Sequence, residues 1–399
     1  MLLVALAAGR ATADPVRLAI DAGAGVNYDS NLYRLSLLEK RSSQFKSVDD
    51  VSVLPHIAGQ LLVPLGLQEF SLAGRLSRRF HAYNTDLDAT ETGIAARLRY
   101  RLPFECSVTL AAHQFRRLTA YDDVLGTPRR ITVRDRLAEG NASCSITPAL
   151  TARAEASAGD RANRDPLLSV YDLNEFGARG EVAYGLIDTV QPFVAARYRH
   201  REQPDFVSAL TPDGTRASIV DAGAGVRWSP TQYLTLSGAA NWTRLRENSH
   251  RRDGDLATGE IVVDWDATGK TRLHLEAVRS LDVSPNVGAI AYPATTLLAR
   301  ASWDATPLLT ASLEARYRHR ALLRDINLGT LPLTRRERDN TVGIDARVEY
   351  KITDKFMARA AAGYRNRSAN FAELEYRAAV VSVGLSYRFA GPPLDVGLE

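Results

Sequence analysis

Arginine recurs at every second residue in four parts of this sequence, and such rows are suited to binding anions. A guanidinium group can hold a carboxylate or a phosphate through two parallel hydrogen bonds. Because side chains two residues apart lie on the same face of a β-strand, each row predicts a cationic strip on one face. The rows are Arg75 and Arg79 with Ser77 between them; Arg97, Arg99 and Arg101; Arg197, Arg199 and Arg201; and Arg316, Arg318 and Arg320.

The residues between these arginines are ones that lipid accepts, such as Leu98, Tyr198 and Tyr317. An arginine on the lipid side of a membrane β-strand costs about 2–4 kcal/mol at the bilayer midplane. The eleven arginines are therefore predicted to face a polar lumen and to contact anions there. The alternative is a salt-bridge lattice, in which inward carboxylates such as Glu314 neutralise the arginines and only stiffen the wall.

The elements that must carry these rows are β-strands, because small or apolar residues alternate with polar ones and no segment keeps a 3.6-residue period. The predicted fold class is all-β, a transmembrane antiparallel β-barrel of about 18 strands. The expected strands are 17–27, 51–64, 67–83, 91–101, 104–117, 131–146, 148–160, 173–186, 189–202, 218–229, 231–246, 256–266, 270–283, 294–304, 307–322, 339–351, 354–368 and 377–389.

The expected connectors alternate in length. Tight turns such as 64–67 and 102–104 are followed by longer polar gaps, and the longer gaps are 28–50, 118–130, 203–217 and 323–338. Short turns on one side, long loops on the other and strands long enough to cross a bilayer are typical of bacterial outer-membrane barrels. Because an open edge would leave backbone groups unpaired in lipid, the strands at 17–27 and 377–389 are predicted to close the sheet.

The chain ends suggest export. Residues 1–13 are interpreted as a signal peptide, with an apolar stretch followed by small residues; 14–389 form the outer-membrane barrel, and 390–399 form a periplasmic tail. The net charge of +4 among 399 residues gives no reason to expect a nucleic-acid partner. No other apolar run approaches the roughly 18 residues that a membrane-spanning helix needs.

No pattern predicts an enzyme, a cofactor or a metal site. The seven histidines occur singly and are interpreted as polar lining of the lumen. A hydrolase site assembled from distant Ser, His and Asp residues is the weaker alternative. Cys106 and Cys144 flank the connector 118–130 at nearly equal distances, so they are predicted to be cross-strand neighbours on the outward face and to form a disulfide in the oxidising periplasm.

The last strand carries a spacing of glycine and aromatic residues, Gly384, Tyr387 and Phe389. It resembles the C-terminal signal that the barrel-insertion machinery reads. Barrels with this signal normally end at the final aromatic residue, whereas this chain continues to Glu399.

The first expected strand ends in a segment that carries a family resemblance, with Tyr28, Asp29, Asn31, Leu32 and Arg34 as its motif. It resembles the EpsL-type outer-membrane barrels associated with exopolysaccharide biosynthesis, within the wider β-barrel porin group. The resemblance implies a role in exopolysaccharide export and carries over no catalytic residue. Read from the residues alone, Asp29 and Asn31 can cap a strand and shape a turn.

Three functions remain open from the sequence. The leading interpretation is a conduit for exopolysaccharide; the alternatives are a general or anion-preferring diffusion porin and a scaffold barrel of an export assembly. The expected partners are outer-membrane lipid and lipopolysaccharide, the barrel-insertion machinery, an acidic exopolysaccharide and periplasmic export proteins.

Overall fold

The computed structural model describes most of the chain after the N-terminal segment. The described residues are 16–36, 40, 47–102, 105–118, 131–165, 168–169, 172–185, 187, 189–205, 214–248, 253–284, 289–328 and 331–391. The expected signal peptide, and all of the expected tail beyond Gly391, lie outside them. Within this part of the chain no helix is long and apolar enough to cross a membrane.

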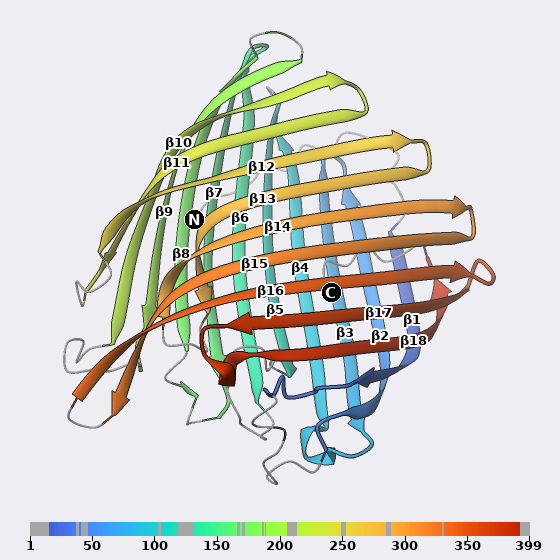
Figure 1. The fold of residues 1–399 in the computed structure, drawn as a ribbon. Helices are drawn as coiled ribbons and strands as arrows, with labels where there is room; N and C mark the ends of the chain where they lie inside the picture. Colours follow the sequence, from blue (N-terminus) through green and yellow to red (C-terminus); the bar gives the residue numbers. More distant parts are fainter. Residues whose placement is uncertain are drawn as a thin grey trace, which may run out of the picture.

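The fold is a single sheet of eighteen strands (Figure 1). In chain order these are β1 Arg17–Asp29, β2 Asp50–Leu65, β3 Gln68–His81, β4 Ala89–Leu102, β5 Cys106–Leu118, β6 Thr132–Thr147, β7 Leu150–Asn163, β8 Leu173–Tyr184, β9 Val190–Gln203, β10 Thr215–Thr231, β11 Leu234–Glu247, β12 Gly254–Thr268, β13 Thr271–Ser284, β14 Ala289–Thr306, β15 Leu309–Leu328, β16 Leu331–Lys351, β17 Phe356–Ala369 and β18 Tyr376–Ala390. Short 3-10 helices, η2 Thr85–Leu87 and η5 Ala372–Leu374, lie in two connections.

Each strand pairs antiparallel with the next, and β1 pairs antiparallel with β18. Along that seam Val26 lies opposite Val383 and Gly25 opposite Gly384. The sheet is therefore closed, and the predicted barrel with its seam between the first and last strands is confirmed. Closure gives every strand two hydrogen-bonded neighbours, which strands need in order to cross lipid.

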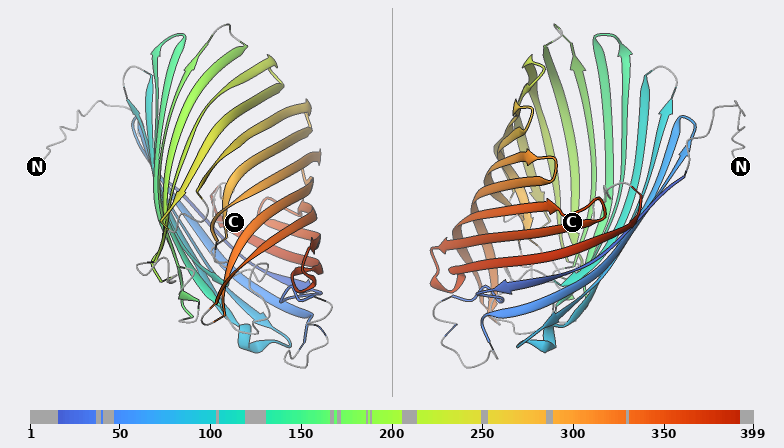
Figure 2. Two further views of the ribbon diagram at one scale, coloured as in Figure 1. Left: turned by 60° about the vertical axis from the view of Figure 1, so that its left-hand side comes forward. Right: turned by 90° about the vertical axis from the view of Figure 1, so that its right-hand side faces the viewer.

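Two sets of strand ends can be distinguished. We call the ends joined by tight turns, such as residues 66–67 and 148–149, the short-turn side, and the opposite ends the long-loop side. The first and last described residues both lie on the short-turn side. The strands spread apart toward the short-turn side and converge toward the long-loop side (Figures 1 and 2).

The prediction of one long loop is wrong. Residues 323–338 were predicted to form a long connector, but β15 runs to Leu328, β16 starts at Leu331, and their register continues from Ala321 opposite Arg338 to Leu328 opposite Leu331. The polar composition of this segment suggested a loop. A strand that is not in contact with lipid needs no apolar outward face, so polarity alone does not exclude strands there.

The two faces of the wall differ as alternation requires. Large apolar side chains point outward and are solvent-exposed in the isolated chain, for example Ile94, Val194 and Leu313, which are 51%, 59% and 50% exposed. Two of the seven histidines, His200 and His319, share this outward face with Tyr198 and Tyr317. Lumen lining was therefore wrong for these two.

Candidate functional site

All four arginine rows point into the barrel. The strand register places them on the face opposite the exposed residues Leu76, Ile94, Val194 and Leu313. The inward arginines from the four rows are Arg75 and Arg79 on β3, Arg97, Arg99 and Arg101 on β4, Arg197, Arg199 and Arg201 on β9, and Arg316, Arg318 and Arg320 on β15. They are spread around the lumen, and their partners depend on their height in the barrel.

At the short-turn side the guanidinium groups of β4 are weakly neutralised. Arg99 lies 4.0 Å from Glu69, with side chains 47% and 40% exposed. Among the described residues, Arg97 and Arg101 form no ion pair. The same holds for Arg75 and Arg197 at mid-height of the wall, whereas Arg316 lies 3.6 Å from Glu314. The short-turn mouth therefore has positive charge available to a solute.

Toward the long-loop side the arginines are engaged by carboxylates. Arg199 lies 3.2 Å from Asp221, and Arg201 pairs with Glu175. Arg318 pairs with Asp282 and donates to the Tyr292 hydroxyl at 2.6 Å, while Arg79 lies 3.7 Å from Glu91. In this half of the barrel the structure corresponds to the salt-bridge lattice.

A buried cluster joins three neighbouring strands of that lattice. Asp339 of β16 lies 2.9 Å from Arg320 of β15 and 3.0 Å from Arg367 of β17, and its side chain is 0% exposed. Removing one member of such a pair leaves an uncompensated buried charge, which is strongly destabilising. Arg320 therefore stiffens the wall and is not available to a solute.

A second cluster was not found from the sequence. Glu181 of β8, 4% exposed, lies 3.3 Å from Arg153, 2.9 Å from Arg179 and 2.7 Å from Arg227. Arg227 also stacks 4.4 Å from the centroid of the Phe193 ring. The arginines come from three different strands, so no row of spacing two reveals them. Only the strand register, which brings their inward positions together, could have done so.

The lumen narrows where opposite walls approach each other. Cα atoms of β14 lie within 8 Å of Cα atoms of both β9 and β10, although these strands are not neighbours in the sheet. Arg199 of β9 donates to the carbonyl oxygen of Leu281 on β13 at 3.3 Å. A buried apolar cluster on this side of the barrel contains Leu173, Ala217, Ile219, Leu245 and Leu281.

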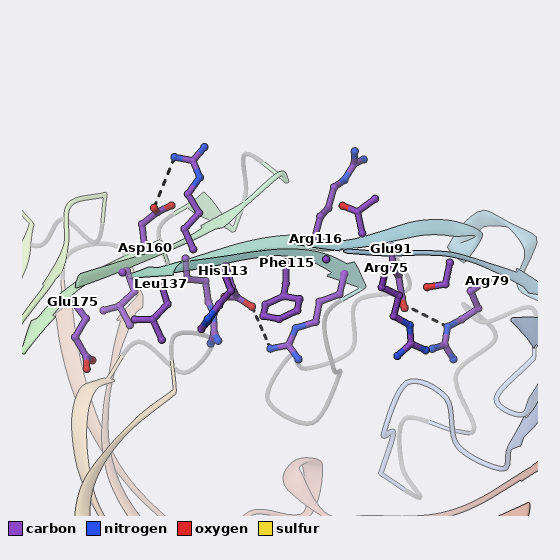
Figure 3. A pocket seen from close by; sticks show the side chains of 18 of the residues that line it. Arg75, Arg79, Glu91, His113, Phe115, Arg116, Leu137, Asp160 and Glu175 are labelled. Atoms are coloured by element: carbon purple, nitrogen blue, oxygen red, sulfur yellow. Dashed lines mark hydrogen bonds and ion pairs between the residues drawn. The ribbon is translucent and has the colours of Figure 1, made fainter. Parts of the chain in front are cut away.

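The wall from β2 to β8 lines a cavity of about 640 Å³ (Figure 3). Arg75, Arg79 and Glu91 lie at one end of it, and His113, Phe115, Leu137 and Glu175 follow along the same side of the sheet. Cationic, acidic and apolar groups thus share this cavity. No group of three or more His, Cys, Asp or Glu side chains in the described part of the chain could hold a metal ion.

The segment Tyr28–Arg34 forms a buried network of hydrogen bonds where β1 ends; we call it the β1 network. The Asn31 side chain, 0% exposed, donates to the carbonyl oxygens of Leu35 at 2.9 Å and Arg377 at 3.0 Å, and it accepts from the Leu35 N–H. Asp29 forms an ion pair with Arg34 at 2.8 Å, and Arg34 adopts a φ of 57°. The segment is thereby tied to β18.

The β1 network adjoins a small apolar core. Tyr33 and Leu35 pack with Leu87, Ile131 and Val133, and partly buried Leu32 covers this cluster. The Tyr33 hydroxyl donates to Asn84 at 3.1 Å. Burial raises the pKa of Tyr33 to about 12, and Asp50 and Asp86 act in the same direction. Tyr28 differs from its neighbours, because it points outward and is 39% exposed.

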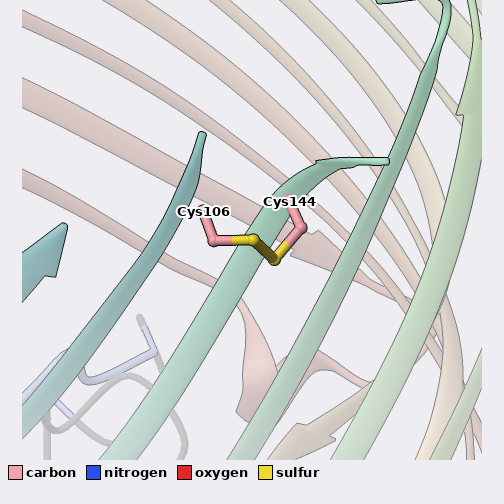
Figure 4. Close-up of a disulfide and its surroundings, with 2 residues drawn as sticks. All are labelled: Cys106 and Cys144. Carbon is pink, nitrogen blue, oxygen red and sulfur yellow. A yellow bond between two sulfur atoms is a disulfide. The ribbon is translucent and has the colours of Figure 1, made fainter. Parts of the chain in front are cut away.

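The two cysteines lie opposite each other on β5 and β6 and are joined by a disulfide (Figure 4). They share the outward face with Leu110.

In the last strand, β18, Tyr387 contacts Phe356 and Phe389 with ring centroids 4.7 Å and 4.8 Å apart, and Gly384 lies on the opposite face beside Gly25. Tyr387 and Phe389, the aromatic residues of the expected insertion signal, thus form an outward cluster at the short-turn side.

Comparison with known sequences adds one family. Residues 154–389 match the family described as Putative beta-barrel porin 2, and the segment Tyr28–Arg34 lies outside the matched residues. No curated protein matches the sequence.

Two of the similar solved structures share the barrel with a TM-score above 0.5. A mutant of the ferric enterobactin receptor from Pseudomonas aeruginosa, in complex with enterobactin, is 9% identical with a TM-score of 0.52 over 94% of this chain and 81% of that chain. The FrpB iron transporter from Neisseria meningitidis is 8% identical with a TM-score of 0.51, over 94% and 83%. OccK2 from Pseudomonas aeruginosa is 12% identical with a TM-score of 0.46, over 94% and 98%. At these identities the first two likenesses concern the fold alone.

Proposed function

This chain belongs to the beta-barrel porin 2 family, and we propose that it forms a passive channel for small anions in the bacterial outer membrane. The observation that supports this proposal is the inward row Arg97, Arg99 and Arg101, whose one ion-pair partner among the described residues is Glu69 at 4.0 Å. A strip of positive charge at a mouth attracts anions and speeds their entry.

The outer face supports the proposed membrane location. By the strand register, the outward positions near mid-height and on the short-turn side carry no charged residue in the described strands. The outward arginines lie toward the long-loop side; they are Arg78, Arg116, Arg134, Arg136, Arg216, Arg244, Arg246, Arg279, Arg338 and Arg377. An uncharged band bounded by charge is what a lipid bilayer requires of a barrel.

The proposal is tested by replacing the short-turn row and measuring ion selectivity. The triple change Arg97→Gln, Arg99→Gln and Arg101→Gln should lower the anion-to-cation permeability ratio in planar bilayers, because the mouth loses its excess positive charge. The matched control is Arg216→Gln with Arg244→Gln, which removes arginines from the outer face and should leave the ratio unchanged. An unaltered ratio in a conducting triple variant would contradict the proposal.

The same row favours a second candidate, passage of an acidic polysaccharide that enters from the short-turn side. Alternate strand residues lie about 7 Å apart, so the three arginines offer successive contacts to a chain of carboxylates. The resemblance of Tyr28–Arg34 to exopolysaccharide-associated barrels motivates this candidate. An oligouronate added on the short-turn side should then reduce the ion current, whereas a neutral dextran of the same length should not. Equal effects of both polymers would exclude the polymer and leave the small-anion proposal standing.

A further inference from the structure

Three arginines on the outer face of β5 and β6 form a cluster that the lumen does not use. Arg116 lies directly opposite Arg134, and Arg136 follows two residues along β6 on the same face. Figure 3 shows Arg116 and Asp160 on the opposite side of the sheet from His113, Phe115 and Leu137, which line the lumen. The cluster therefore faces away from the lumen, near the long-loop side.

This cluster has too little negative charge around it. Asp160 lies 3.9 Å from both Arg134 and Arg136, and no other ion pair reaches the three guanidinium groups within the described residues. The Nε atoms of Arg116 and Arg134 are buried and have no hydrogen-bond partner. Like charges directly opposite each other across two strands are destabilising. The arrangement is therefore complementary to an additional anion.

An apolar groove of about 680 Å³ begins next to the arginines. Its floor is one row across five strands: Leu72, Ala96, Ala112, Ala138 and Ala158 lie opposite one another in register. Phe176, 48% exposed, follows Ala158 on β8 and bounds the row on that side.

Small residues continue this floor toward the short-turn side. The next outward row has Gly140, Ala156 and Ala178 opposite one another on β6, β7 and β8. The surface beyond the groove therefore stays apolar and low in side-chain bulk along the strands into the uncharged band, the direction a hydrocarbon chain would take.

We propose that this surface binds lipid A of the outer leaflet, with its phosphate groups against Arg116, Arg134 and Arg136 and an acyl chain over the alanine row. The inference rests on the proposed outer-membrane location, which places the long-loop side in the leaflet that contains lipid A. Arginine matches phosphate in charge and in bidentate geometry. A soluble phosphate would make no use of the apolar groove, whereas the acyl chain of a lipid would cover it. The groove therefore favours a lipid as the occupant.

The test measures binding of fluorescent lipid A, and of the same lipid after phosphatase treatment, to the full-length barrel in detergent. The native protein should prefer the phosphorylated form by about tenfold, which corresponds to about 1.4 kcal/mol. The double change Arg134→Gln and Arg136→Gln should abolish that preference. Ala138→Leu should weaken binding of both forms, because it fills the groove floor.

The matched control is again Arg216→Gln with Arg244→Gln, which removes two outward arginines at a similar height but away from the groove, and which should bind as the native protein does. Equal binding of both lipid forms by the native protein, or native binding by the double variant, would overturn the proposal. Binding of phosphatidylglycerol as tight as that of lipid A would overturn the choice of lipid. Because the side chains changed here are at outward positions of the wall, ion selectivity measured on the same preparations decides the channel proposal separately.

Discussion

Asn31 shows at the scale of one residue how the segment Tyr28–Arg34 is held in place. Its amide group is fully buried and makes hydrogen bonds to backbone groups of Leu35 and Arg377, which are far apart in the sequence. The sequence showed that Asp29 and Asn31 stand where a strand becomes a loop, and it offered turn formation as an explanation. It could not show the partners, because Arg377 comes from the last strand and meets Asn31 only when the barrel closes.

Replacing Asn31 by alanine should reduce the free energy of unfolding by about 2–3 kcal/mol, since buried backbone groups lose their hydrogen-bond partners. Urea unfolding of the purified barrel in detergent or lipid measures this change. Ser47→Ala is the control, because Ser47 makes an exposed hydrogen bond to Asp49 and its loss should have little effect. Equal unfolding midpoints for the native protein and the Asn31 variant would show that the β1 network contributes nothing to stability.

Tyr33 makes the stability of the β1 network sensitive to alkaline pH. Its pKa is raised from 10.0 to about 12 in the folded chain, mainly by burial, so the folded state favours the protonated hydroxyl. The resulting stabilisation is fully present below pH 10 and is lost as the pH rises through 12. Urea midpoints should therefore fall more steeply between pH 10 and 12 for the native protein than for Tyr33→Phe. Parallel pH profiles would contradict this.

At the scale of the strands, alternation was sufficient to predict the architecture, because in a membrane barrel one face meets lipid and the other meets a wet lumen along every strand. It failed at β15 and β16, whose ends continue as a paired hairpin through a polar segment that lacks the alternation. It also failed for the outward histidines, because polarity alone does not assign a face near the long-loop side.

The hairpin of β5 and β6 carries the prediction that belongs to this scale. The disulfide between Cys106 and Cys144 spans 38 residues, so its removal in Cys106→Ala with Cys144→Ala should lower stability by about 2–4 kcal/mol through a less constrained unfolded state. Thiol titration of denatured mature protein should find no free thiol. Two free thiols per chain in the exported protein would refute the disulfide.

At the scale of the whole molecule, the approach of β14 to β9 and β10 determines how wide the lumen is. Alternation assigns Ile219 and Arg199 to the inner face but cannot tell which strand lies across the lumen, so the sequence left the width of the pore open. The same limit applies to the charges. The arginine rows in the sequence identified which arginines point inward. Only the structure separates the arginines that are paired with carboxylates from those that are available to a solute.

Ile219→Ala should widen this constriction. Ile219 is 0% exposed within the apolar cluster, and truncation of a buried isoleucine costs about 2–5 kcal/mol, which weakens the contact between the walls. Single-channel conductance should rise, while Ile261→Ala, at an outward position that is 61% exposed, should leave it unchanged. An unchanged conductance in a folded Ile219→Ala barrel would place the limiting constriction elsewhere.

The most direct test of the channel is the zero-current potential of the native protein across a planar bilayer with a KCl gradient. The row Arg97, Arg99 and Arg101 at the short-turn mouth predicts a potential with the sign of chloride preference, and a smaller potential at high salt, because screening shortens the reach of the charges. A potential with the sign of potassium preference, or a bilayer that stays non-conducting after insertion of folded protein, would contradict the account.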